Sequence, residues 1–124
     1  MSAREWVIEL PWTTPPLTEN QRWAHWAQKA GTTRRVRGAV YTAAGRRRIP
    51  TLGRCEVTLH WAPRDRRRRD ADNIVPTLKA ACDGLVDVGI VPDDTPELMV
   101  KHMPVIAPPE RPARMWLVVR EVLA

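Results

Sequence analysis

The residues best suited to chemistry in this sequence are aspartates grouped within one stretch of a basic chain. Seven of the fourteen acidic residues lie between Asp65 and Asp94, and they include the pairs Asp70/Asp72 and Asp93/Asp94. In an extended segment, residues i and i+2 project to the same side, so the carboxylates of Asp70 and Asp72 would point at one place. Their repulsion requires a positive partner, and Mg²⁺ prefers such hard oxygen ligands. The pattern therefore indicates a site for a divalent cation.

A structural role for each pair stays open beside this one. D-x-D-N before a helix is often only a capping arrangement, and two aspartates in a turn are ordinary turn chemistry. Histidines offer little support for a different metal site, because His25, His60 and His102 are dispersed along the chain. Each pair taken alone favours the structural role, and only the pairs together with the arginines beside them bring cation binding to about equal weight.

A run of arginines directly precedes the first aspartate pair. The formal net charge is +6, and seventeen of the twenty basic residues are arginine. Burying so many guanidinium groups is prohibitive, so the segment Arg64 to Asp70 must be exposed. Arginine suits bidentate contacts to phosphate, which predicts a polyanion as partner. The expected DNA-contacting residues of this run are Arg64, Arg66, Arg67, Arg68 and Arg69. A coding bias toward arginine is the alternative source of the excess.

The periodicity of apolar residues places this stretch between a strand and a helix. Residues 54–61 alternate as a half-buried strand. A helix then begins close to Pro76, which is tolerated only in a first turn, with either Asp72 or Asn73 as N-cap and Gly89 at the C-terminal end. Its apolar face consists of Ile74, Leu78, Cys82 and Leu85, with Ala81 beside them. The N–H groups at the start of such a helix favour phosphate.

The remaining elements complete a small α/β domain of the α+β kind. A strand is predicted at residues 6–10, and a helical pattern begins near Asn20, is interrupted or ended by Gly31, and continues through Val36, Val40 and Ala44. Two further strands are predicted at 98–103 and 115–122, the last of them central. The predicted order is β-α-β-α-β-β, with about four strands in a mixed or antiparallel sheet and two main helices. We expect residues 1–124 to form a single domain.

Between Pro63 and Asp94 the sequence contains, in order, a proline with an arginine run, D-x-D-N, a helix with K-A-x-x-D-x-L, and a turn with D-D. These residues are Pro63, Arg66 to Arg69, Asp70, Asp72, Asn73, Lys79, Ala80, Asp83, Leu85, Asp93 and Asp94. In this order they resemble the RusA family of Holliday junction resolvases. The segments E-L-P-W at Glu9 and V-K-H-M-P at Val100 are also similar, whereas residues 13–54 match weakly.

That resemblance implies a homodimeric, Mg²⁺-dependent endonuclease, with Mn²⁺ able to substitute, acting on branched DNA such as four-way junctions. It implies that Asp70, Asp72 and Asp94 bind the catalytic metal, with Asp93 a less certain neighbour. Asn20 and Asn73 would contact DNA, although a capping role for Asn20 is an equal alternative.

Lys79 matches the family's helix lysine but departs from its spacing. It follows Asp72 by seven residues, where the family pattern has four. The alternative for Lys79 is an i,i+4 pair with Asp83, worth roughly 0.3 kcal/mol. The two roles are equally weighted, and the catalytic assignment of Lys79 stays open.

Six tryptophans and two cysteines have expected places as well. Trp6, Trp61 and Trp116 fall on strands and are predicted to lie in the core, while Trp12, Trp23 and Trp26 could stack on unpaired bases. For Trp26, packing in the core or in a dimer is favoured. Cys55 and Cys82 are expected to be buried and unpaired.

Two other classes of function remain open. One is a basic DNA-binding protein without catalysis, and the other is a metal nuclease acting on other branched DNA. The sequence has no apolar run near twenty residues and no signal-peptide pattern, so we expect a cytoplasmic protein of a bacterial cell or a phage-infected host, without membrane contact.

Overall fold

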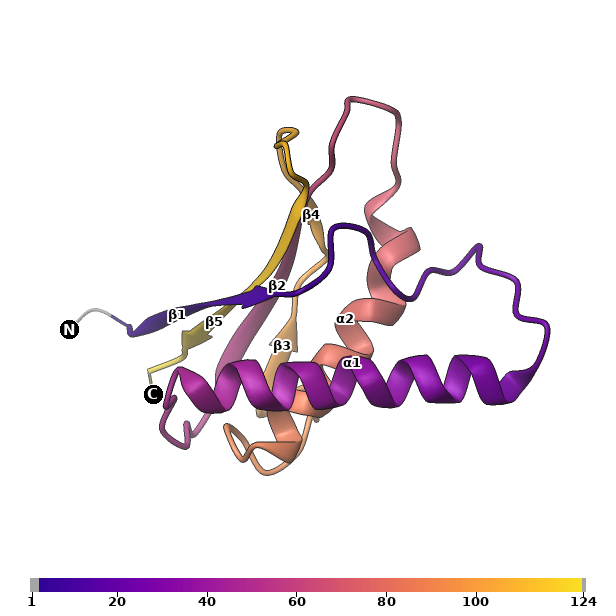
Figure 1. Cartoon of the computed structure of the whole chain (residues 1–124). Helices are drawn as coiled ribbons and strands as arrows, with labels where there is room; N and C mark the ends of the chain where they lie inside the picture. Colours follow the sequence, from indigo (N-terminus) through magenta and orange to yellow (C-terminus); the bar gives the residue numbers. More distant parts are fainter. Residues whose placement is uncertain (1–2, 124) are drawn as a thin grey trace.

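A five-stranded mixed sheet and two α-helices make up the computed structural model, which describes residues 3–123 (Figure 1). The elements in chain order are β1 (Glu5–Leu10), α1 (Trp26–Arg46), β2 (Cys55–Ala62), a short 3₁₀ helix η1 (Ala71–Ile74), α2 (Val75–Asp87), β3 (Met99–Lys101), β4 (Val105–Ile106) and β5 (Arg114–Glu121). This confirms a single α+β domain with two main helices. The sheet has one strand more than predicted, because the expected strand at 98–103 ends at Lys101 and Val105–Ile106 forms a separate two-residue strand.

The strand order is β1-β5-β2-β3, with β4 also paired to β2. β5 runs antiparallel to both β1 and β2, which confirms its predicted central place. β3 and β4 follow one another along the other edge of β2 and are parallel to it. The segment after α2 therefore returns along the sheet in the direction that leads toward the arginine loop.

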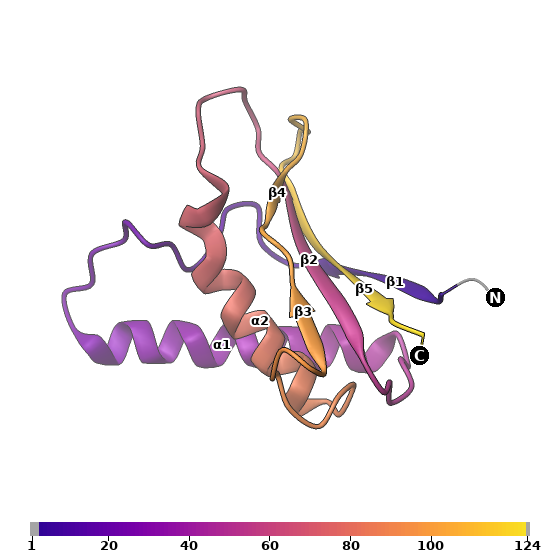
Figure 2. The same cartoon turned by 180° about the vertical axis from the view of Figure 1, so that it is seen from behind.

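One face of the sheet shares its core with both helices. The side chains of Cys55, Val57 and Leu59 are fully buried there with Leu117 and Val119, as period-two alternation predicts. Leu78, Ala81, Cys82 and Leu85 of α2 and Val40 and Ala44 of α1 complete this core. Figure 2 shows no helix on the opposite face, where the rings of His60 and Trp116 stack with centroids 5.1 Å apart. Trp116 thus lies outside the core in which it was predicted.

The helix α1 is longer and starts later than the sequence indicates. It runs without a break through Gly31, so the predicted interruption is wrong; one glycine costs a helix only about 1 kcal/mol, which packing readily offsets. Residues 20–25 are not helical. The backbone N–H groups of Glu19 and Asn20 instead bind the backbone and side-chain oxygens of Asn73, at 2.9 and 3.1 Å, which holds this segment against the start of α2.

The predicted side-chain cap of α2 is also absent. Asp72 and Asn73 lie inside η1, and neither η1 nor α2 has a side-chain hydrogen bond at its N-cap. Asn73 is instead engaged by Asn20, as described above. Pro76 does lie in the first turn of α2, and Gly89 has φ +90° just beyond its end, as predicted.

The two cysteines are buried and unpaired, as expected. Burial raises the pKa of the Cys55 thiol to about 11 and that of Cys82 to about 12. Both thiols therefore stay protonated near neutral pH and act as small apolar core groups. Within residues 3–123, no helix has the length and apolar character needed to cross a membrane.

Candidate nucleic-acid and metal site

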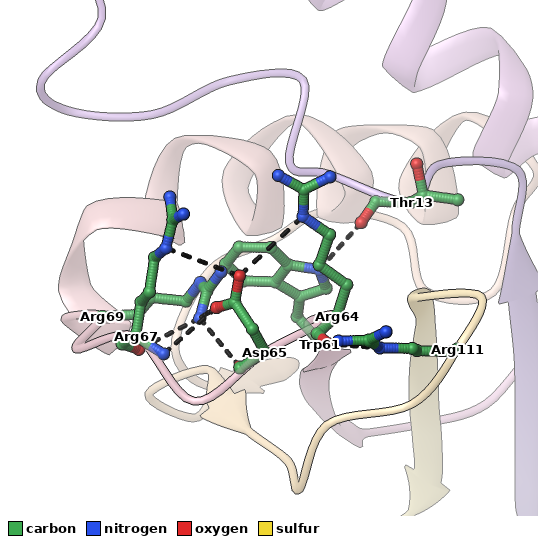
Figure 3. Close-up of polar contacts among 7 residues, drawn as sticks. All are labelled: Thr13, Trp61, Arg64, Asp65, Arg67, Arg69 and Arg111. Atoms are coloured by element: carbon green, nitrogen blue, oxygen red, sulfur yellow. Dashed lines mark hydrogen bonds and ion pairs between the residues drawn. The ribbon is translucent and has the colours of Figure 1, made fainter.

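The loop between β2 and η1 carries the arginine run and is organised around Asp65. The Asp65 carboxylate lies 2.8 Å from the Arg69 guanidinium, 3.6 Å from that of Arg67 and 3.8 Å from that of Arg64 (Figure 3). It also accepts a hydrogen bond from the backbone N–H of Arg67 at 3.1 Å. The backbone hydrogen bond from Arg67, together with the side-chain hydrogen bond from Arg69, holds the pKa of Asp65 below its usual range. Asp65 is therefore the internal counterion of the loop.

Arg69 differs from its neighbours because its side chain is largely enclosed. Its Nη1 donates to the backbone oxygens of Asp65 and Arg67, both at 3.0 Å, and its guanidinium lies over the Trp61 ring, 5.1 Å from the centroid. Trp61 is itself fixed, since its Nε1 donates to the Thr13 oxygen at 3.0 Å. Trp61 is thus a core residue, as predicted, and its ring also packs against Arg69 of the arginine loop.

Asp70 and Asp72 follow the loop as exposed residues at the start of η1. Within residues 3–123, neither carboxylate forms an ion pair, although four arginines directly precede Asp70. Three arginines of this loop, Arg64, Arg67 and Arg69, pair with Asp65 instead. Asp72 lies in the 3₁₀ helix η1 and not in an extended segment, so the predicted projection of both carboxylates to one side is not confirmed. Each remains an unneutralised carboxylate, the kind of ligand that a hard divalent cation takes.

A small cavity of about 230 Å³ brings together five of the predicted site residues. It is lined by Asn20, Arg68, Arg69, Asp70 and Asn73, together with four other residues. The hydrogen bond between the Asn20 N–H and the Asn73 side chain joins its two walls. Segments fifty residues apart in sequence thus converge beside Asp70, with cationic and polar groups next to an unpaired carboxylate.

Asp94 is engaged by a residue that the sequence analysis did not single out. Its carboxylate accepts a hydrogen bond from the Lys101 ammonium of β3 at 2.8 Å. That bond keeps the pKa of Asp94 below its usual range. Burial lowers the pKa of Lys101, but the bond to Asp94 and the nearby acidic groups outweigh it and raise the pKa overall. Exposed Asp93 accepts a hydrogen bond from the Asp94 N–H at 2.8 Å, as in an ordinary turn.

Lys79 is exposed on α2 and lies near the Asp94–Lys101 pair. It lines a cavity of about 340 Å³ with Lys101, His102, Val75 and other residues. In the described part of the chain Lys79 forms no ion pair with Asp83, so the structural alternative for Lys79 is not realised. Because Lys101 shares this cavity with Val75 and Lys79, the Asp94–Lys101 pair lies close to the first turns of α2, the helix that Asp70 and Asp72 precede.

The three aspartates nevertheless do not form a closed cation site. Among residues 3–123, no group of three or more His, Cys, Asp or Glu side chains is arranged to hold a metal ion. Asp70 and Asp72 fit a hard cation by their chemistry and by their lack of protein partners. Asp94 fits only if its carboxylate leaves Lys101, which supplies its positive partner in this structure.

The tryptophans near the loop after β1 divide into covered and exposed residues. Trp12 and Trp23 are partly buried against a small cluster of Leu17, Val36 and Ala80. Trp26 is 84% exposed, so its predicted packing does not occur in the core of this chain. It is the aromatic side chain most available for stacking.

No known protein-family model matches the chain, and no curated protein does either.

Proposed function

We propose that this chain is a metal-dependent endonuclease that cuts four-way DNA junctions, acting as a homodimer. The observation that carries the proposal is the charge arrangement after β2: Asp65 neutralises part of the arginine run, which leaves Asp70 and Asp72 exposed without a protein cation. The resemblance to the RusA resolvases at the same residues supports the nuclease class. Two-fold symmetry of a junction is the reason for a dimer.

In this proposal Asp70 and Asp72 would hold Mg²⁺ or Mn²⁺, and Asp94 would join them after release from Lys101. When bound, the cation supplies an activated water and stabilises charge on the transferring phosphate. The chain's own groups hold and orient the strand. Arg66 and Arg68 attract the backbone as exposed cations, and Asn20 and Asn73 line the adjoining cavity. Lys79, exposed on α2, would add a further cation along the path of the strand.

The experiment that tests the proposal is Asp70→Asn in a cleavage assay on a four-way junction with Mg²⁺. We expect cleavage to be abolished, because a carboxylate ligand becomes a weaker neutral one. Junction binding in EDTA should stay unchanged or become tighter, since a negative charge near phosphate is removed. Calorimetric titration with Mn²⁺ should show weakened binding of the ion.

Glu97→Gln is the matched control, because Glu97 is exposed and forms no ion pair within the described residues. It should cleave at the rate of the unmodified chain. If Asp70→Asn also cleaves at that rate, the metal role of Asp70 is wrong. A panel of flap, fork and three-way substrates distinguishes a junction resolvase from a nuclease with broader branched substrates.

A second candidate function is favoured by the Asp94–Lys101 pair. A carboxylate already neutralised by an ammonium is what a non-catalytic, basic DNA-binding protein would have at this place. That function predicts junction binding without cleavage in any divalent metal. The cleavage assay with and without Mg²⁺ therefore separates the two candidates.

A further inference from the structure

A cavity of about 780 Å³ is lined by residues of the arginine loop but not by Asp70. Its walls come from three separate parts of the chain: the segment after β1, the loop after β2, and the segment that leads into β5 (Figure 3). The last of these contributes Arg111, Pro112 and Ala113, which none of the sequence patterns assigned to a site.

The charges that line this cavity do not balance. Four guanidinium groups, from Arg64, Arg67, Arg69 and Arg111, face a single carboxylate, Asp65. Four positive charges and one negative charge leave +3 in one concave place. Arg111 makes a hydrogen bond only to the Arg64 backbone oxygen, at 3.3 Å, and pairs with no carboxylate among residues 3–123. Concentrated positive charge of this kind favours an anion as its ligand.

One wall of the cavity is held by hydrogen bonds, and two of the arginine side chains that line it are largely exposed to solvent. Trp61, held by Thr13, and Arg69, held by two backbone oxygens, form the fixed wall. The side chains of Arg64 and Arg67 are 75% and 78% exposed, so they can reorient toward a bound group. Trp61, Pro112 and Ala113 add apolar surface beside these cations. A ligand with one anionic group and an adjoining less polar part matches this lining.

We propose that this cavity binds a nucleotide unit of a DNA strand that has left the duplex, with its phosphate held by Arg64, Arg67 and Arg111. A volume of this size suits a small molecule, whereas phosphates of an intact duplex lie on a convex surface and need only surface cations. An unpaired nucleotide can place its phosphate against the guanidinium groups and its sugar against Pro112 and Ala113. The identification of the anion as DNA rests on the proposed function; the anion site itself rests on the geometry.

The test compares single-stranded and duplex DNA binding in EDTA, so that no metal chemistry contributes. The variants are Arg111→Ala and Arg64→Ala, and the matched control is Arg120→Ala, which removes the same charge from an exposed position on β5. We expect both cavity variants to weaken binding of a labelled oligothymidine about tenfold. Duplex binding should change no more than it does in Arg120→Ala. Thermal melting monitored by circular dichroism verifies that each variant is folded.

The proposal is overturned if the cavity variants lose no more oligothymidine affinity than Arg120→Ala does. A competition experiment adds a second measurement on the unmodified protein. Thymidine monophosphate should displace the oligothymidine at lower concentration than inorganic phosphate does, and equal displacement would mean a site for phosphate alone. If Asp70→Asn cleaves normally while this selectivity holds, the cavity stands and the nuclease assignment fails.

Discussion

Two single residues, Asp65 and Lys101, set the charge state of the candidate site. Asp65 draws Arg64, Arg67 and Arg69 toward itself, and Lys101 neutralises Asp94. Within residues 3–123, Asp70 and Asp72 are left without a protein cation, beside a loop in which three arginines pair with Asp65. The carboxylates of Asp70 and Asp72 therefore stay outside the ion pairs that Asp65 forms with the arginines.

The Asp94–Lys101 pair gives a pH dependence at this scale. The pKa of Asp94 is lowered in the folded chain, so the pair stabilises the fold at pH values above the unfolded pKa, near 3.8. That contribution is lost as the pH falls through the lowered folded value. Asp94→Asn should reduce the free energy of unfolding at pH 7 by ~0.5 kcal/mol, since the pair is partly exposed. Urea unfolding at pH 7 and pH 2 measures this, and the difference should be smaller at pH 2, where the carboxylate is closer to protonation.

Glu97→Gln serves again as control and should leave stability unchanged at both pH values. An Asp94→Asn variant that is as stable as the unmodified chain at pH 7 would mean that the bond to Lys101 contributes nothing net. A variant that stays equally destabilised at pH 2 would point to packing rather than charge.

At the scale of elements, the crossing of α1 over α2 holds the site's scaffold together. A Cβ on Gly84 would lie 2.6 Å from the Arg37 backbone oxygen and 3.0 Å from the Val40 Cβ, so the two helices touch there through backbone. Arg37 also makes a bidentate ion pair with Asp87, at 2.9 and 3.0 Å. The position of α2, and with it that of Asp70 and Asp72 at its start, depends on this contact.

Gly84→Ala should destabilise the fold. Overpacking against a backbone oxygen costs about 1–3 kcal/mol, which exceeds the gain of ~1 kcal/mol that alanine brings to a helix. Gly38→Ala is the matched control in α1, because nothing lies within 4 Å of a Cβ placed there. It should raise the free energy of unfolding by up to ~1 kcal/mol. Chemical denaturation measures both, and equal effects of the two variants would contradict the close crossing.

The elements also show what local patterns could and could not predict. Strands β2 and β5 and the buried face of α2 follow from the apolar pattern, because alternate residues of each strand and one face of the helix pack into the same core. The start of α1 and the cap of α2 did not follow. Both depend on Asn73 binding the Asn20 segment fifty-three residues away, and no local pattern reveals that contact.

The same limit applies to the candidate site. The arginine run, Asp70 and Asn73 could be predicted because they are adjacent in sequence and unusual in composition. Lys101 and Arg111 could not, because each is an isolated basic residue whose importance comes from what the sheet brings beside it. The one signal in the sequence for Lys101 is that it is a basic residue on the strand that directly follows the acidic turn at Asp94.

At the scale of the whole molecule, the positive charge is unevenly distributed. Two arginines at the sheet have carboxylate partners: Arg114 bonds to Glu9 and Glu110, and Arg4 bonds to Glu121. The loop between β2 and η1 projects from the end of the sheet at which β2 ends, away from both chain ends (Figure 1). There Arg66 and Arg68 are exposed and have no carboxylate partner within residues 3–123. This loop is therefore one place at which a polyanion should approach.

This distribution predicts how junction affinity responds to salt. Each phosphate neutralised on duplex arms contributes about −0.9 to the slope of log affinity against log salt concentration. Replacing both Arg66 and Arg68 by alanine should reduce that slope by roughly 1.8, because two phosphate contacts are lost together. Replacing the paired residues Arg4 and Arg114 removes the same formal charge and should change the slope less, since those guanidinium groups already have protein anions. Fluorescence anisotropy in EDTA at several salt concentrations measures both slopes. Equal slopes for the two double variants would mean that net charge alone attracts the DNA and that the loop has no special place in binding it.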